Sequence, residues 1–86
     1  MIEIEYVGAI RGDLGLDDEQ EQLDWTPEIT DVAALIDLLC EQRGEQWAAI
    51  LKQEKLLISV NQKMVKPGHP LTDGDKIGFY PPIAGG

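Results

Sequence analysis

The sequence has few of the groups from which catalytic and metal sites are built. Its 86 residues contain one cysteine, Cys40, and one histidine, His69. One cysteine cannot form an internal disulfide, and one histidine without a second ligand at a usable spacing is typical of a surface loop. The sequence shows no glycine-rich phosphate loop, and no nucleophile paired with a histidine and a carboxylate in a recognisable pattern. We therefore expect no metal site and no self-contained catalytic centre.

Basic residues are scarce as well. Seven lysines and arginines stand against sixteen aspartates and glutamates, which gives a formal net charge of −9. This charge repels phosphate backbones and anionic membrane surfaces, and it favours docking onto a basic protein surface. The sequence has neither the basic start and apolar run of a secretion signal nor the roughly 18 to 20 apolar residues that cross a bilayer. We therefore expect a cytoplasmic, soluble protein with protein partners, and neither nucleic acid nor membrane among them.

The apolar residues that are present predict one small α+β domain over residues 1–86. Ile2, Ile4 and Tyr6 alternate with glutamates, which is the period of a strand with one face on a core. Helical spacing follows Thr30, which we expect to cap a helix that ends before Gly44. The remaining patterns predict a loop over the glycines at 8, 12 and 15, a strand around 22–25, a helix over 31–43, a shorter helical turn around Trp47, a strand within 55–61, a short return strand, and a last strand over 77–80. This order favours a small mixed β-sheet packed on one main helix.

Two further groups have a structural interpretation that we prefer to a chemical one. Cys40 falls on the apolar face of the expected helix, where a free cysteine usually packs against a core. Asp13, Asp17, Asp18 and Glu19 lie close together, but they lack the ordered alternation and the final bidentate glutamate of a calcium loop. We interpret these four carboxylates as a solvated acidic edge.

The last ten residues, 77–86, contain no charged side chain. Pro81 and Pro82 restrict the backbone to extended conformations, so they predict a stiff segment beyond the last strand. Gly85 and Gly86 add no side chains, and a carboxylate on a terminal glycine is ionised at neutral pH, unhindered, and open to attack once it is adenylated. A frayed glycine pair would also end in this way. The combination nevertheless favours a carrier that uses its own C-terminal carboxylate.

At this point the chain resembles the ubiquitin-like sulfur carriers, and within them the small subunits of molybdopterin synthase. The resemblance rests on three stretches, which together with the helix between them cover nearly the whole chain: "LLISVNQKMV" at 56–65, "HPLTDGDKIGFYPPIAGG" at 69–86 and, more weakly, "YVGAIRG" at 6–12. It implies a β-grasp fold in which the last strand lies centrally beside the first. An uncharged tail can then enter a partner's apolar channel without the cost of burying a charged side chain.

The resemblance also implies a chemistry and a set of partners. An activating enzyme would use ATP to adenylate the Gly86 carboxylate, and a sulfur donor, a cysteine desulfurase or a rhodanese-like protein, would convert the adenylate into a thiocarboxylate. The tail would then enter the large subunit of molybdopterin synthase, in an assembly expected to be a heterotetramer, and give its sulfur to the dithiolene of molybdopterin. The chain itself would be a subunit without a bound cofactor.

The resemblance assigns roles to individual residues as well. The apolar dock would comprise Phe79, Tyr80, Pro81 and Ile83, the tail would thread the channel with Pro82, Ala84 and Gly85, and Gly86 would carry the sulfur. Arg11 falls on the arginine of the family's F-A-x-x-R-E stretch and could contact the activating enzyme. This chain departs from that stretch, because Gly12 and Asp13 stand where a glutamate is expected.

Three alternatives remain open at this stage. A carrier for thiamine or tRNA thiolation would use the same tail, although the thiazole-pathway carriers are usually shorter and lack "FYPP". A ubiquitin-like protein modifier would link its C-terminal glycine to lysines of other proteins after the same adenylation. A β-grasp interaction module with an inert tail is the third alternative.

Overall fold

The computed structural model describes residues 1–82, and the predicted sites Ile83, Ala84, Gly85 and Gly86 lie outside this range. The described chain forms five strands and three helices. In chain order they are β1 (Ile2–Tyr6), α1 (Ala9–Asp13), β2 (Gln20–Leu23), α2 (Val32–Arg43), α3 (Glu45–Leu51), β3 (Leu57–Val60), β4 (Lys63–Val65) and β5 (Lys76–Tyr80). Over residues 1–82 the structure contains no helix long and apolar enough to span a membrane.

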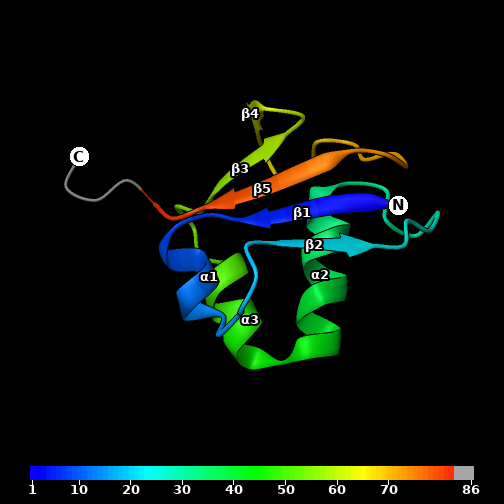
Figure 1. Cartoon of the computed structure of the whole chain (residues 1–86). Coiled ribbons are helices and arrows are strands. Elements are labelled where there is room, and N and C mark those ends of the chain that lie inside the picture. Colours follow the sequence, from blue (N-terminus) through cyan, green and yellow to red (C-terminus); the bar gives the residue numbers. More distant parts are fainter. Residues whose placement is uncertain (83–86) are drawn as a thin grey trace.

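The five strands form one mixed sheet in the order β2-β1-β5-β3-β4. β1 and β5 are parallel, while the β1/β2, β3/β4 and β3/β5 pairs are antiparallel. The helices lie on one side of the sheet, and the chain start lies at the opposite end of the sheet from the end of β5 (Figure 1). The α+β prediction is confirmed, and so is the central position of the last strand beside the first.

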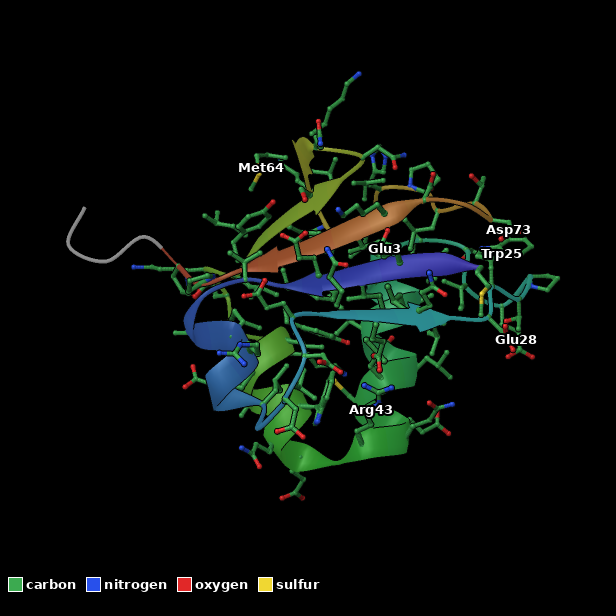
Figure 2. The ribbon with its side chains drawn as sticks, viewed as in Figure 1. Glu3, Trp25, Glu28, Arg43, Met64 and Asp73 are labelled. Atoms are coloured by element: carbon green, nitrogen blue, oxygen red, sulfur yellow. The ribbon has the colours of Figure 1, made fainter. Side chains whose placement is uncertain are left out.

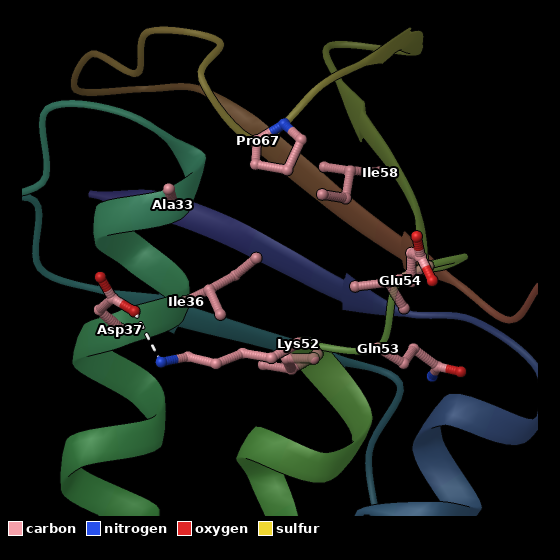
Figure 3. A pocket seen from close by; sticks show the side chains of 10 residues that line it. Ala33, Ile36, Asp37, Lys52, Gln53, Glu54, Ile58 and Pro67 are labelled. Atoms are coloured by element: carbon pink, nitrogen blue, oxygen red, sulfur yellow. Dashed lines mark ion pairs between the residues drawn. The ribbon is translucent and has the colours of Figure 1, made fainter.

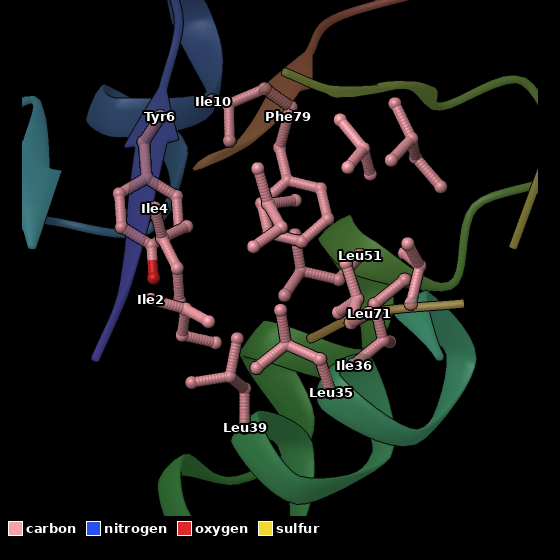
Figure 4. Packing of buried hydrophobic residues seen from close by; sticks show 14 of the residues in the cluster. Ile2, Ile4, Tyr6, Ile10, Leu35, Ile36, Leu39, Leu51, Leu71 and Phe79 are labelled. Carbon is pink, nitrogen blue, oxygen red and sulfur yellow. The ribbon is translucent and has the colours of Figure 1, made fainter. Parts of the chain in front are cut away.

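The core lies between the sheet and the helices because strand alternation sends every second side chain toward α2. Ile2, Ile4 and Tyr6 of β1 are buried as predicted, and Ile77 and Phe79 of β5 pack beside them with no exposed surface (Figure 4). From α2 the core takes Val32, Leu35, Ile36 and Leu39. Burial of a side chain of this size stabilises the fold by about 1.5 to 3 kcal/mol.

The structure corrects three local predictions. The expected loop over the glycines contains α1, a helix too short for hydrophobic periodicity to reveal, with Ile10 buried. Asp31, not Thr30, caps α2, because its carboxylate accepts a hydrogen bond of 2.7 Å from the backbone N–H of Ala34. β2 ends at Leu23, before Trp25, whose indole N–H donates to the carbonyl of Ile29 at 3.2 Å.

Candidate functional site

The described part of the tail begins where the central strand β5 ends. We call Pro81 and Pro82 the tail root. Just before it, the backbone N–H of Val7 donates to the carbonyl of Phe79 at 2.9 Å, so β1 is hydrogen-bonded to β5 up to that end. Pro81 lies against the turn at Gly8, where an added Cβ would be 3.7 Å from the proline Cγ. The tail therefore leaves a strand that is paired on both sides.

Phe79 is not part of a docking surface, which corrects the role that the resemblance implied for it. Its side chain is 0% exposed, and its ring stacks on Tyr6 with the ring centroids 6.0 Å apart (Figure 4). The reason is strand alternation, since Phe79 shares the inward face of β5 with Ile77. A partner cannot reach this ring without unfolding the carrier.

Tyr80 points to the opposite side of the sheet and is half-buried. Its hydroxyl accepts a hydrogen bond of 3.4 Å from the hydroxyl of Ser59, which is itself buried. Between the two lies Gly78, where an added Cβ would come within 2.6 Å of the Ser59 oxygen and 3.0 Å of the Tyr80 ring. The absence of a side chain at Gly78 is therefore what allows Tyr80 to lie across the sheet.

Two further apolar side chains share this outer face. Leu57 is paired directly with Tyr80, and Met64 is paired with Ser59. Directly paired residues point to the same side of a sheet, so Leu57, Met64 and Tyr80 form one surface, which we call the outer-face patch. Met64 is 58% exposed and stands on the side of β4 away from the helices (Figure 2). Sequence reasoning missed Leu57 and Met64, although the alternation of both strands carries the signal.

A polar network holds the end of β1 against the helices beneath the sheet. The Tyr6 hydroxyl donates to Glu21 at 2.8 Å, and Arg43 binds both oxygens of the same carboxylate at 2.8 and 3.0 Å. The Arg43 guanidinium also lies 4.6 Å from the ring centroid of Trp47, and this ring meets Tyr6 edge-on. We call these four residues the Tyr6 brace; Arg43 lies below β2 in Figure 2.

The two acidic groups of the Tyr6 brace, the Tyr6 phenol and the Glu21 carboxyl, have pKa values shifted in opposite directions. Burial raises the pKa of the Tyr6 phenol, and its hydrogen bond to Glu21 raises this pKa further. Burial alone would also raise the pKa of Glu21, but the hydrogen bonds from Arg43 and Tyr6 outweigh it and hold this pKa below 4.5. In this hydrogen bond the neutral phenol donates and the ionised carboxylate accepts.

The remaining candidate residues lie in several places. Arg11 is half-buried in α1, and its guanidinium donates to the carbonyl of Asp17 at 3.1 Å, beside an open acidic hollow that includes Asp18 and Glu19. Cys40 is half-buried, and burial raises the pKa of its thiol. His69 is exposed, as predicted for a loop residue. In residues 1–82 no three His, Cys, Asp or Glu side chains come together as a metal site would require.

The "LTDGD" stretch that carried much of the resemblance lies at the other end of the sheet from the tail root. The Asp75 carboxylate accepts from the backbone N–H of Thr72 and the amide of Asn61, both at 2.9 Å. The ammonium of Met1 pairs with Asp73, which lies at that end in Figure 2. This motif fixes the turn that leads into β5, and its role in the described structure is structural.

A second hollow lies on the helix side of the sheet. It has a volume of about 400 Å³ and lies between α2, the end of α3 and β3, with an apolar floor that includes Ile36 and Ile58 (Figure 3). The ion pair between Lys52 and Asp37, at 2.9 Å, crosses its rim, and both side chains are more than half exposed. None of the predicted site residues lines it.

A family model, a curated relative and solved structures all match this chain. The model of the ThiS family matches residues 5–86. The molybdopterin synthase sulfur carrier subunit of Escherichia coli is 37% identical over 86 residues, which are all of both chains. Urm1 of Trypanosoma brucei has a similar structure, with a TM-score of 0.77 at 23% identity, covering 99% of this chain and 94% of that one.

A further similar structure comes from a complex of subunits 1 and 2 of the molybdopterin-converting factor of Helicobacter pylori. It has a TM-score of 0.61 at 24% identity, and the match covers 99% of this chain and 97% of that one. At these identities the likeness to the two solved structures shows the fold alone, which is the ubiquitin-like β-grasp fold.

Proposed function

Because the chain belongs to the ThiS family, we propose that it is the sulfur carrier subunit of molybdopterin synthase. The observation that carries this proposal is the match to the Escherichia coli sulfur carrier subunit, at 37% identity without a gap in coverage at either end. The structure adds a physical reason. The tail leaves the middle of the sheet, where the Tyr6 brace holds the strand end, so it can be extended into a partner while the body of the carrier stays outside.

In the proposed reaction the working group is the carboxylate of Gly86. An activating enzyme transfers AMP from ATP to this carboxylate and releases pyrophosphate, which turns a poor electrophile into a reactive acyl-adenylate. The outer sulfur of a persulfide donor then attacks the acyl carbon and AMP leaves, which gives an acyl disulfide. A second thiol attacks the donor-side sulfur of this disulfide, so the two donor sulfurs end as a disulfide and the carrier is released as a thiocarboxylate. Apart from the Gly86 carboxylate, the carrier supplies no acid, base or nucleophile in this scheme, and its folded part positions the tail.

The proposed partner at the delivery step is the large subunit, which would receive the tail and contact the outer-face patch. This patch replaces Phe79 as the apolar dock, because Leu57, Met64 and Tyr80 lie on the outer face and Tyr80, which is paired with Leu57, directly precedes the tail root. An apolar surface of this kind gains free energy when a partner removes it from water. The Ile83 and Ala84 side chains would continue the contact into the channel.

The decisive experiment is to express the chain with its activating enzyme and sulfur donor and to fragment the purified carrier by mass spectrometry. We expect sulfur in place of one oxygen in the C-terminal peptide. Because oxidation of a methionine gives almost the same mass change, the fragment ions must place the change on Gly86.

Deletion of Gly86 should leave folding and docking largely intact and abolish sulfur delivery to a pterin precursor.

The same samples test the alternatives. A plain carboxylate on Gly86 together with adducts on lysines of other proteins would favour the protein modifier. A thiocarboxylate that the large subunit does not consume, but that supports thiazole or tRNA thiolation, would favour the other sulfur pathways. A tail that is never adenylated would leave only the interaction module.

A further inference from the structure

We propose that Met64 is a reversible oxidation site, and that converting its thioether to a sulfoxide weakens docking of this carrier onto the large subunit. The inference rests on the proposed function, since it concerns the surface that the proposed partner covers. The first observation is the solvent exposure of the methionine side chains. Within residues 1–82, Met1 and Met64 are the exposed large hydrophobic side chains, and each is 58% exposed. Thioethers that water reaches to this extent are also open to peroxides.

The position of Met64 gives its oxidation a consequence. Met64 is paired with Ser59, whose hydroxyl donates to Tyr80 at 3.4 Å, so the thioether belongs to the outer-face patch. Met1 is at the other end of the sheet, where its ammonium pairs with Asp73 and its carbonyl accepts from the N–H of Gly74 at 2.9 Å. The chain thus provides two methionines that match in exposure and differ in whether they lie on the patch.

The modification itself is a two-electron oxidation by a peroxide such as hydrogen peroxide. The sulfur lone pair attacks one peroxide oxygen, the O–O bond breaks, and the second oxygen leaves as water after it takes a proton. The sulfur is oxidised to the sulfoxide, and the peroxide is reduced. A methionine sulfoxide reductase, which draws two electrons from a dithiol, reverses the change.

Docking should weaken because the sulfoxide oxygen is a strong hydrogen-bond acceptor. If a partner covers it with an apolar surface, the oxygen loses its water and gains no donor. The hydroxyl of Ser59, the residue paired with Met64, cannot replace that water, because Ser59 is 4% exposed and already donates to Tyr80. We expect the dissociation constant to rise about tenfold, which corresponds to about 1.4 kcal/mol.

The test measures binding of the full-length carrier to the cognate large subunit by calorimetry, before and after treatment with hydrogen peroxide. Peptide fragmentation reports oxidation at each methionine. Met64→Leu keeps the apolar volume and removes the reactive sulfur, while Met1 and Cys40 remain as internal controls. Met64→Gln imitates the polar sulfoxide without any oxidant. Leucine and glutamine are both compatible with an exposed position on a strand. The unfolding transition of each variant is measured in parallel.

We expect peroxide to weaken binding of the native carrier to the large subunit about tenfold, and to leave the binding of Met64→Leu unchanged although its Met1 is oxidised. The reductase should restore the binding of the native carrier. Met64→Gln should bind about tenfold more weakly without treatment. The inference is overturned if the native carrier with fully oxidised Met64 binds as before, or if Met64→Leu loses as much affinity as the native chain. Absence of binding by the untreated carrier would refute the proposed function as well, so the two failures are distinguishable.

Discussion

At the scale of single residues, three neighbours at the end of β5 have three different tasks. Gly78 leaves room on the outer face, Phe79 fills the core, and Tyr80 lies across the outer face. The alternation of Ile77 and Phe79 with Gly78 and Tyr80 is visible in the sequence and predicts both faces. The docking role for Phe79 was wrong because the resemblance identifies an aromatic pair without saying which ring points inward.

The first prediction separates the two aromatic residues. Phe79→Ala should lower the free energy of unfolding by about 3 to 5 kcal/mol, since it leaves a cavity under the sheet. Tyr80→Ala should cost less than about 1.5 kcal/mol, because the ring is half-exposed, and should weaken binding to the large subunit about tenfold. Urea titration and calorimetry measure the two effects. A folded Phe79→Ala protein that has lost docking, beside a Tyr80→Ala protein that docks normally, would contradict the assignment.

The second prediction concerns the space above Gly78. Gly78→Ala should destabilise the fold by about 1 to 3 kcal/mol, because the new methyl group meets the Ser59 oxygen at 2.6 Å and the Tyr80 ring at 3.0 Å. Ser59→Ala removes the closer of these atoms, so the double variant should lose less stability than the two single variants together. Urea titrations of all four proteins give the coupling. Strictly additive losses would show that the two sites do not share this space.

At the scale of elements, the Tyr6 brace ties β1, β2, α2 and α3 into one unit below the tail root. The sequence predicts each of these elements apart from its ends, since the alternation in β1 and the spacing in α2 are strong signals. It does not predict the brace, because Tyr6, Glu21 and Arg43 come together only through tertiary packing. α1 escaped prediction for a different reason: its five residues include Gly12, a poor helix former, and cover little more than one turn.

The third prediction follows from the lowered pKa of Glu21. A carboxyl whose pKa is lower in the folded protein contributes stability that is complete above its unfolded value, near 4.5, and is lost as the pH falls through the folded value. The native carrier should therefore lose stability as the pH falls below about 4.5. In Glu21→Gln this part of the loss should be absent, although stability at pH 7 is lower. Urea midpoints of the two proteins, measured from pH 7 down through this range, give both the acid loss and the difference at pH 7. If the stability of the two proteins falls in parallel with pH, the assignment is refuted.

At the scale of the whole molecule, charge is divided between the two edges of the sheet. Thirteen of the sixteen acidic residues lie in the first 45 residues, which hold two of the seven bases. The acidic Asp18 and Glu19 precede the edge strand β2, whereas Lys63 and Lys66 lie in and after the opposite edge strand β4. The backbone N–H of Tyr6 donates to the carbonyl of Glu19 at 2.7 Å, so the acidic edge reaches the end of the sheet from which the tail leaves.

The fourth prediction is that this acidic edge steers the carrier toward a basic surface beside the tail channel of its partner. Asp18→Asn with Glu19→Gln should slow association with the large subunit several-fold at low salt and leave dissociation nearly unchanged, because exposed charges act mainly on the encounter rate. The matched control is Glu41→Gln with Glu45→Gln, an equal change in net charge at the α2–α3 junction, far from the sheet (Figure 1). Stopped-flow rates at about 20 and 500 mM salt measure the effect, which should vanish at the higher concentration because the Debye length falls to a few ångströms. Equal slowing by both pairs would mean that net charge alone sets the rate, and no slowing by either would mean that this edge does not face the partner during the encounter.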